Sequence, residues 1–358
     1  MLDFTSALYL GLVHEHASLR PWHQLTTGKP AVLSTMPGVR ALAADLALLA
    51  GCEAATLAPS TLHLFIDVFR IWGCHSTTVF IDSALYQIGL WGVERATGLG
   101  MPAHRFSHHD PGSLARSLRR DMCRTPVIVT DGYCPCCGEP APIPAYLDCL
   151  GGQRGWMVID DTQALGVLGR APCTRVPLGL GGGGIMQWFG IRDPRIVLIS
   201  SLAKAFGVPM AFLAGTRSLV DRFEQVSETR VHCSPISAPA LHAAEQAIAF
   251  NEHEGDRARG TLMQSILRLQ RKLQASPLRL RGGAFPLQSL SSVPYLTAEE
   301  IHRRLDASEI QTVLQKARTS GPRIAFLLTA RHTLHDIDRL GAALLAMSEP
   351  SLRIKRHA

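Results

Sequence analysis

The sequence contains 358 residues, of which 46% are hydrophobic and 18% are charged, and this composition is typical of a globular protein with a large core. The formal net charge is +7 and the arginines are dispersed, so we interpret the charge as solvated surface or as a docking surface for an acidic substrate or carrier, and we expect no nucleic-acid partner. No apolar run approaches the roughly 18 residues needed to cross a bilayer, and the acidic start lacks the basic region of a signal peptide, so we expect no membrane association.

A helix is the first regular element that the sequence predicts, over residues 39–51, and it ends at a glycine. Short apolar runs bounded by turn residues follow it, and we interpret them as buried strands. These runs cover residues 77–82, 126–132, 156–161, 195–201 and 210–215. Because helical stretches lie between the strands, the order predicts an α/β fold with a mostly parallel central sheet and helices on both faces. Ligands in such sheets lie beyond the carboxyl ends of the strands.

Two long helices are predicted over 237–253 and 258–276. The last hundred residues predict a smaller α+β unit, with a strand over 322–330 and a closing helix over 333–347. We therefore divide the chain into an N-terminal segment (1–38), a large domain (39–235) and a small C-terminal domain (236–358). Between the predicted strands, the glycine-rich stretch "GLGGGGI" (179–185) lacks the phosphate-loop pattern, and we expect it to form a flexible surface turn.

The nine cysteines are odd in number and mostly scattered, which favours reduced thiols in a cytoplasmic protein. Three of them, Cys134, Cys136 and Cys137, lie together in "YCPCCGEP" (133–140). Such a cluster could form half of a zinc site, but the sequence offers no second pair of ligands with the usual spacing. We therefore expect no metal site.

The most informative lysine is Lys204, in "RIVLISSLAKAFGVPMAFLAG" (195–215). It follows a predicted strand in a tight turn and is flanked by apolar residues. One interpretation is a surface lysine whose stem lies along apolar neighbours. The other is a lysine that holds a carbonyl cofactor as a Schiff base, helped by a lowered pKa. The segment alone leaves both open.

Two adjacent acids, Asp160 and Asp161, end the predicted strand of "WMVIDDTQALGVLG" (156–169). Buried carboxyl groups are costly unless they are paired or functional. Metal binding is one explanation, although no histidine lies nearby in sequence. A pyridoxal cofactor is another, because a carboxylate at the pyridine nitrogen keeps the ring protonated.

The segments "IDDTQALGVLG" (159–169) and "ISSLAKAFG" (199–207) together resemble the pattern "VDDAHGTGVLG … GTLSKAFG" of the pyridoxal-phosphate-dependent α-oxoamine synthases. Further ordered likenesses cover nearly the whole chain. They are "DFTSALYLGL" (3–12), "FIDSALYQIGLWGVERATG" (80–98), "FSHHD" (106–110), "VTDGYCPCCGEPAPIP" (129–144) and "HTLHDIDRL" (332–340). The resemblance implies a fold-type I pyridoxal-phosphate enzyme of the aminotransferase class I/II group.

Several site residues follow from this resemblance position by position. Lys204 matches the Schiff-base lysine, and Asp160 matches the carboxylate on the pyridine nitrogen. Ser201 matches a hydroxyl that holds the phosphate, and Ser234 matches a threonine that reaches the phosphate from the partner subunit. Asp131 matches the glutamate that opens the loop after a central strand. The resemblance thus implies a homodimer with a shared active site.

Other positions depart from the family pattern. Tyr86 replaces the histidine that stacks on the cofactor ring, and an aromatic ring can still stack there. Gln163 replaces the histidine three residues after the key aspartate, and Pro135 replaces that histidine's serine neighbour. Thr61 and Leu62 replace a glycine-aromatic pair near the phosphate, so a hydroxyl is gained and a ring is lost.

Two departures concern the substrate. Met210 and Ala211 replace a pair of glycines, which we expect to narrow the pocket. Arg323 is the arginine nearest to the family's ligand for the substrate carboxylate, but it lies two residues out of register.

The reaction implied by the resemblance is a condensation of an α-amino acid with an acyl thioester of coenzyme A or an acyl carrier protein. Carbon dioxide is lost, an α-amino ketone forms, and Lys204 shuttles the proton. The departures at Gln163 and Met210 leave open another pyridoxal-phosphate reaction, either aminotransfer or decarboxylation. A non-catalytic partner subunit is the third possibility, and the presence of both Lys204 and Asp160 argues against it.

Overall fold

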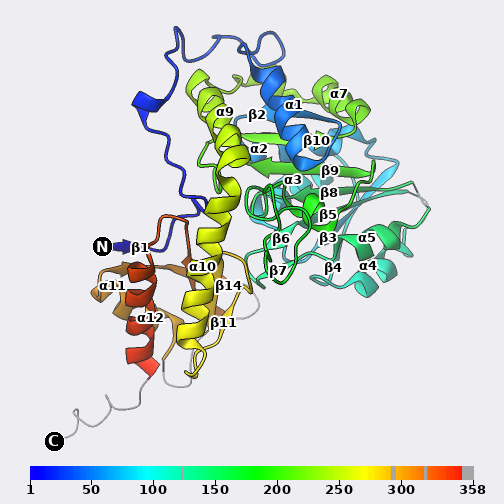
Figure 1. Cartoon of the computed structure of the whole chain (residues 1–358). Helices are drawn as coiled ribbons and strands as arrows, with labels where there is room; N and C mark the ends of the chain where they lie inside the picture. The colour runs from blue at the N-terminus through cyan, green and yellow to red at the C-terminus, as the bar shows by residue number, and fades with distance from the viewer. Residues whose placement is uncertain (122–123, 153, 292–295, 318–320, 349–358) are drawn as a thin grey trace, which may run out of the picture. The chain divides into compact units, whose positions relative to one another are not determined.

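The computed structural model describes residues 1–121, 124–152, 154–291, 296–317 and 321–348, and these form two compact units (Figure 1). The large unit comprises Leu12–Cys134 and Pro140–Asp256. The small unit comprises Met1–Gly11, Pro135–Glu139 and the chain from Arg257 on. The contacts thus divide the chain after Asp256, whereas the sequence analysis placed the start of the small domain at residue 236.

A seven-stranded sheet forms the centre of the large unit, in the order β2-β10-β9-β8-β5-β3-β4. The strands are β2 (Ala54–Ala58), β3 (Thr77–Asp82), β4 (Ala103–Phe106), β5 (Thr125–Asp131), β8 (Trp156–Asp160), β9 (Ile196–Ser201) and β10 (Ala211–Gly215). Neighbours from β9 to β4 are parallel, whereas β10 is antiparallel to both β9 and β2. The predicted mostly parallel sheet is confirmed, and each of its five predicted strands agrees with the structure to within one residue at either end.

Two strands of this sheet, β2 and β4, were missed by the sequence analysis, and each has a physical reason. β2 reads "AATLA", and alanine has a low preference for strands. β4 lies at the sheet edge and is largely exposed, so it lacks the continuous apolar run that marked the central strands.

Both faces of the sheet are covered, which explains those apolar runs. Alternate strand residues such as Val129, Val158 and Ile199 pack with apolar side chains of α2 (Thr61–Val68), α3 (Gln87–Gly98) and α7 (Arg217–Val226). The intervening residues, such as Ile128 and Ile159, are buried on the opposite face. The remaining α-helices of this unit are α1 (Val39–Ala50), α4 (Pro111–Leu118), α5 (Ile143–Leu150), α6 (Ile185–Phe189), α8 (Glu228–His232) and α9 (Ala238–His253).

The small unit is an α+β structure, as predicted. Its antiparallel sheet has the order β11-β12-β15-β14, and β1 pairs with β13 in a separate parallel ribbon. These strands are β1 (Leu2–Asp3), β11 (Leu280–Arg281), β12 (Leu287–Ser291), β13 (Ile310–Gln311), β14 (Val313–Ala317) and β15 (Gly321–Leu327). The helices α10 (Gly255–Leu273), α11 (Ala298–Ala307) and α12 (Leu334–Ser348) complete the C-terminal part of the chain.

Two short strands, β6 (Tyr133–Cys134) and β7 (Glu139–Pro140), flank the cysteine-rich segment. None of the eight cysteines among the described residues forms a disulfide. No helix within the described part of the chain combines the length and apolar character needed to cross a membrane.

The glycine-rich stretch 179–185 was predicted to be a surface turn, and the structure shows this to be wrong for its second half. Residues 182–185 are buried. The N–H group of Ile185 lies 3.2 Å from each carboxyl oxygen of the buried Asp161. Gly184 has φ +85°, and a Cβ atom there would lie 1.9 Å from Asp161 Oδ2. The glycines therefore let the backbone approach a buried carboxyl group.

We predict that Gly184→Ala destabilises the protein much more than Gly181→Ala. Both glycines have a positive φ, but a Cβ atom at Gly181 would meet nothing within 4 Å. The backbone strain common to both variants costs about 1–2 kcal/mol. The clash with Asp161 adds roughly 1–3 kcal/mol at Gly184 only. Urea unfolding measures both losses, and equal losses would contradict the packing role of Gly184.

Candidate active site

The predicted site residues converge on the carboxyl edge of the large sheet. Asp131 ends β5 and Asp160 ends β8, and their Cα atoms are direct partners across the two strands. Ser201 ends β9 and is level with Ala211 of β10, which in turn is level with Ala58 at the end of β2. The loops that follow β2, β5, β8 and β9 therefore leave the sheet at the same edge, where β10 begins.

Asp160 and Lys204 are two oppositely charged groups at this edge, and each shifts the pKa of the other. Asp160 is only 6% exposed, and burial raises the pKa of its carboxyl group, while hydrogen bonds from Thr162 and the charge of Lys204 lower it. Burial lowers the pKa of the Lys204 ammonium group, against the charges of Asp160 and Asp131. A lysine with a lowered pKa is more readily a free amine and thus a nucleophile. This environment favours the cofactor interpretation of Lys204 over the surface one.

The loop that carries Lys204 is held by several backbone hydrogen bonds. Gly207 N–H donates to the Lys204 carbonyl over 3.2 Å, and Leu202 N–H donates to the Met210 carbonyl over 2.9 Å. Ser201 Oγ donates to the Met210 carbonyl over 3.2 Å. His14 Nε2 lies 2.8 Å from the Phe206 carbonyl oxygen, a contact that the sequence analysis missed. The side chain of Met210 is buried, and its effect on pocket width stays a prediction.

Asp131 anchors the start of α3. Both of its carboxyl oxygens accept from Tyr86 N–H, over 3.1 and 3.3 Å. Tyr86 is the N-cap residue of this helix, and it is 56% exposed. The structure thus fixes the backbone of Tyr86 beside Asp131 and leaves its ring open for stacking on a planar ligand.

The predicted phosphate ligands lie at one helix start, at one strand end and on the chain between α8 and α9. Thr61 and Leu62 are the first residues of α2, where free backbone N–H groups favour an anion. Ser201 lies at the end of β9, and Ser234 is exposed on the chain that follows α8. The phosphate role of these four residues stays a prediction.

Thr162 is a site residue that the sequence analysis missed. Its N–H donates to Asp160 Oδ1 over 3.0 Å, and its Oγ1 accepts from Ser201 N–H over 3.1 Å. The signal was present in the sequence, because Thr162 stands where the quoted family pattern has alanine. Gln163 is half-buried beside it, and its role in place of the family's histidine stays a prediction.

Arg323 lies in the small unit, on β15, and is almost fully buried. Its guanidinium group donates to the carbonyl of Cys136 in the same unit. Its role as a ligand for the substrate carboxylate stays a prediction. Pro135 also belongs to the small unit. That Pro135 and Gln163 replace the family's serine and histidine together likewise stays a prediction.

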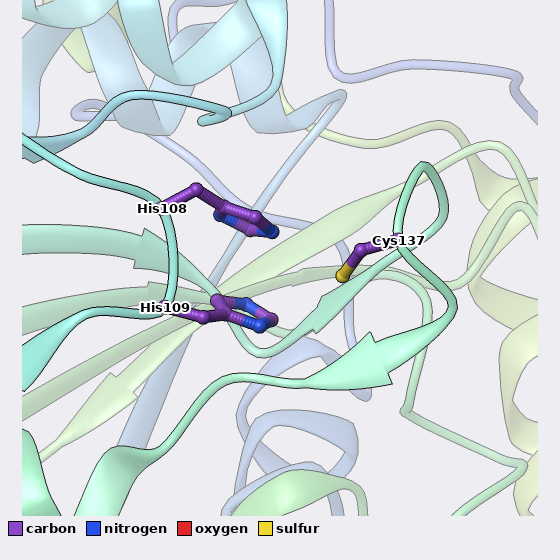
Figure 2. A group of neighbouring side chains, drawn as sticks. All are labelled: His108, His109 and Cys137. Atoms are coloured by element: carbon purple, nitrogen blue, oxygen red, sulfur yellow. The ribbon is translucent and has the colours of Figure 1, made fainter. Parts of the chain in front are cut away.

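Asp82 ends β3 and organises a further polar cluster of the large unit. Its Oδ1 lies 2.7 Å from His108 Nδ1, and its Oδ2 accepts from Tyr146 Oη and His109 N–H over 3.3 Å each. Burial tends to raise the pKa of Asp82, but the bonds from His108 and the backbone outweigh it, and the pKa is lowered. Figure 2 shows the His108 and His109 rings lying over each other, with centroids 3.7 Å apart; it also draws Cys137, which belongs to the small unit.

The large unit provides the groups that pyridoxal phosphate needs. Lys204 offers an amine whose pKa is lowered, and Asp160 offers a buried carboxyl group for the ring nitrogen. The exposed ring of Tyr86 and the start of α2 offer a stacking surface and an anion site. The residues present therefore fit this cofactor.

Comparisons with known proteins agree with this arrangement. The family model "Aminotransferase class I and II" matches residues 24–330. The chain is 28% identical to 8-amino-7-oxononanoate synthase of Methylococcus capsulatus, over 96% of this chain and 88% of that protein. It is 30% identical to the enzyme of the same name from Halorhodospira halophila, over 87% and 75% of the two chains. Among solved structures, serine palmitoyltransferase of Sphingomonas wittichii aligns with a TM-score of 0.81, 15% identity and coverage of 96% and 86%. The 8-amino-7-oxononanoate synthase of Francisella tularensis aligns with a TM-score of 0.77, 18% identity and coverage of 97% and 96%.

We predict that His108→Leu weakens the protein in a pH-dependent way. Because the pKa of Asp82 is lowered in the folded state, its ionised form contributes stability above the ordinary carboxyl pKa of about 4, and this contribution is lost as the pH falls through the folded value. The variant's deficit should be about 1–3 kcal/mol near pH 5 and should shrink below about pH 4.

Urea unfolding at a series of pH values measures this deficit. His108→Gln is the matched control, since it keeps a neutral donor for Asp82 and should lose less. A deficit of constant size across the series would contradict an electrostatic contribution of His108.

Proposed function

The chain belongs to the aminotransferase class I and II family, and we propose that it is a pyridoxal-phosphate-dependent acyltransferase. It would condense an α-amino acid with an acyl thioester, of coenzyme A or an acyl carrier protein, and release carbon dioxide and an α-amino ketone. The observation that carries this proposal is that Lys204 and the buried Asp160 lie close enough, at the carboxyl edge of the sheet, for the charge of each to shift the pKa of the other. Relatives named 8-amino-7-oxononanoate synthase, similar over most of the chain, support the reaction class.

Each site residue has a defined task in this proposal. Pyridoxal phosphate, when bound, supplies an electron sink for the pair left on the substrate α-carbon. Asp160 would keep the ring nitrogen protonated, and Tyr86 would lie on the ring face. Ser201, Thr61 and the start of α2 would bind the phosphate.

Lys204 would first hold the cofactor and then act on the substrate. Its free amine would remove the proton from the α-carbon of the amino acid. The α-carbon would then form a bond to the thioester carbonyl carbon while the carbon–sulfur bond breaks and a thiolate leaves. The bond to the carboxylate would break as carbon dioxide departs, and Lys204 would return the proton to the α-carbon.

A homodimer with a shared active site is part of the proposal. Ser234, the predicted phosphate ligand of the partner subunit, is exposed. Nearby, Ala31 and Val32 donate backbone hydrogen bonds to Cys233 and Arg230. This places three exposed apolar side chains next to Ser234, namely Val32, Leu33 and Val231, which are 49%, 71% and 46% exposed. An exposed apolar patch of this kind favours a protein interface. We further expect the enzyme to be cytoplasmic, in keeping with the described cysteines, which form no disulfide.

We predict that the purified protein binds pyridoxal phosphate with a visible absorption band that Lys204→Ala and Lys204→Arg both abolish. Arginine keeps the positive charge but has no primary amine, so it tests the amine itself. A wild-type protein without the band would contradict the cofactor assignment.

The reaction class is tested by carbon dioxide release from a panel of amino acids, with and without acyl thioesters. Release that depends on a thioester supports the acyltransferase. Release without any thioester would indicate a decarboxylase, and keto-acid formation an aminotransferase. A protein that binds the cofactor but turns over none of the panel would favour the non-catalytic partner subunit.

We predict that Lys204→Ala and Ser234→Ala subunits complement each other. In a mixed dimer, one site would have an intact Lys204 and would receive an intact Ser234 from the other subunit. Random mixing should therefore restore about a quarter of wild-type activity at limiting cofactor. Each variant alone is the control, and a mixture no more active than the mean of the two would contradict the shared site.

A further inference from the structure

Thr162 lies between the two elements that carry the proposed catalytic groups. It follows Asp160 and Asp161 at the end of β8, and its Oγ1 accepts from Ser201 N–H at the end of β9, over 3.1 Å. Its own N–H donates to Asp160 Oδ1 over 3.0 Å. Thr162 therefore connects the carboxyl group on one strand to the start of the Lys204 loop on the next.

The direction of the bond between Thr162 and Ser201 follows from the chemistry of the two groups. A threonine hydroxyl has two lone pairs with which it can accept a hydrogen bond. Because the backbone N–H of Ser201 can only donate, the Thr162 hydroxyl accepts, and this bond holds the Thr162 backbone where its N–H meets Asp160. An alanine, as in the quoted family pattern, could not make the side-chain bond to Ser201.

We propose that Thr162 is a positioning residue for cofactor binding, which keeps Asp160 ionised and oriented toward the cofactor ring nitrogen. This inference rests on the proposed function, since it assigns Asp160 to that nitrogen. Asp131 and Asp161 are the other carboxyl groups in this cluster, and Lys204 is the cation that acts on Asp160. With two further acids close by and burial opposing its charge, ionised Asp160 needs donors, and the Thr162 N–H is one that the Ser201 bond keeps in place.

The test compares Thr162→Val, which keeps the shape without the hydroxyl, with Thr162→Ser, which keeps the hydroxyl. The dissociation constant for pyridoxal phosphate is measured by absorption titration. We expect Thr162→Val to bind about 10-fold more weakly, as for loss of one hydrogen bond, because without its bond to Ser201 the residue no longer holds its N–H on Asp160. Thr162→Ser should stay within about threefold of the wild type.

An Asp160→Asn background separates positioning from simple packing. If Thr162 acts through the charge of Asp160, adding Thr162→Val to Asp160→Asn should weaken binding by less than about threefold. The same loss in both backgrounds would overturn the proposal, as would unchanged binding by Thr162→Val. Thr162→Ala serves the same comparison if the valine variant does not fold.

The cofactor-free protein provides a second readout that does not depend on the proposed function. Burial raises the pKa of Asp160, and loss of the hydroxyl should raise it further. A further rise in this pKa lowers the stability of the folded protein at every pH at which the unfolded carboxyl group is ionised. The urea midpoint of Thr162→Val should therefore lie below that of Thr162→Ser at neutral pH, and the two midpoints should converge toward about pH 4.

The two readouts distinguish the two ways of failing. Suppose that the difference in urea midpoint depends on pH but the wild type does not bind the cofactor. This result would contradict the cofactor assignment and still support the action of Thr162 on Asp160. A difference independent of pH would show a packing role and overturn the inference.

Discussion

The cost of burying charge at the carboxyl edge of the sheet governs the loops of the large unit. Asp131, Asp160 and Asp161 are all nearly or fully buried, and Lys204 is the cation that acts on the first two. One ammonium group cannot compensate three carboxyl groups in a poorly solvated site, so the remaining stabilisation has to come from hydrogen-bond donors. Each acid accepts from a backbone N–H group: Asp131 from Tyr86, Asp160 from Thr162 and Asp161 from Ile185.

These three donors explain why the surrounding loops have the conformations they do. Tyr86 N–H lies at the start of α3, so satisfying Asp131 fixes where that helix begins. Ile185 N–H can reach Asp161 only because Gly184 has no side chain at the point of contact. Thr162 satisfies Asp160 from its own loop and binds Ser201 N–H as well, which fixes the beginning of the Lys204 loop. The geometry of the candidate site and the structure of its loops thus have a common electrostatic cause.

The sequence predicts those parts of the molecule whose signal is local. Central strands such as 156–160 are apolar up to their last residue because both faces are buried, and they could be located to within a residue. Lys204 and Asp160 lie in short motifs that can be recognised from the sequence alone. β2 and β4 could not be found this way, since one is alanine-rich and the other is an exposed edge strand. Thr162 and the buried glycines were missed or misread for another reason: their roles depend on Ser201 and Asp161, which are 39 and 23 residues away in the sequence.

The order of the strands also gives the site a charge polarity. Along the sheet edge, the acids Asp131 and Asp160 end the neighbouring strands β5 and β8, whereas Ser201 ends β9 and Thr61 follows β2. The edge therefore runs from carboxyl groups on one side to hydroxyl groups and a helix N-terminus on the other. Pyridoxal phosphate has the complementary polarity, with a protonated ring nitrogen at one end and a phosphate at the other. A uniformly charged ligand would match only one of these two regions and a neutral ligand would match neither, so the arrangement of acids and hydroxyl groups favours one orientation of this cofactor.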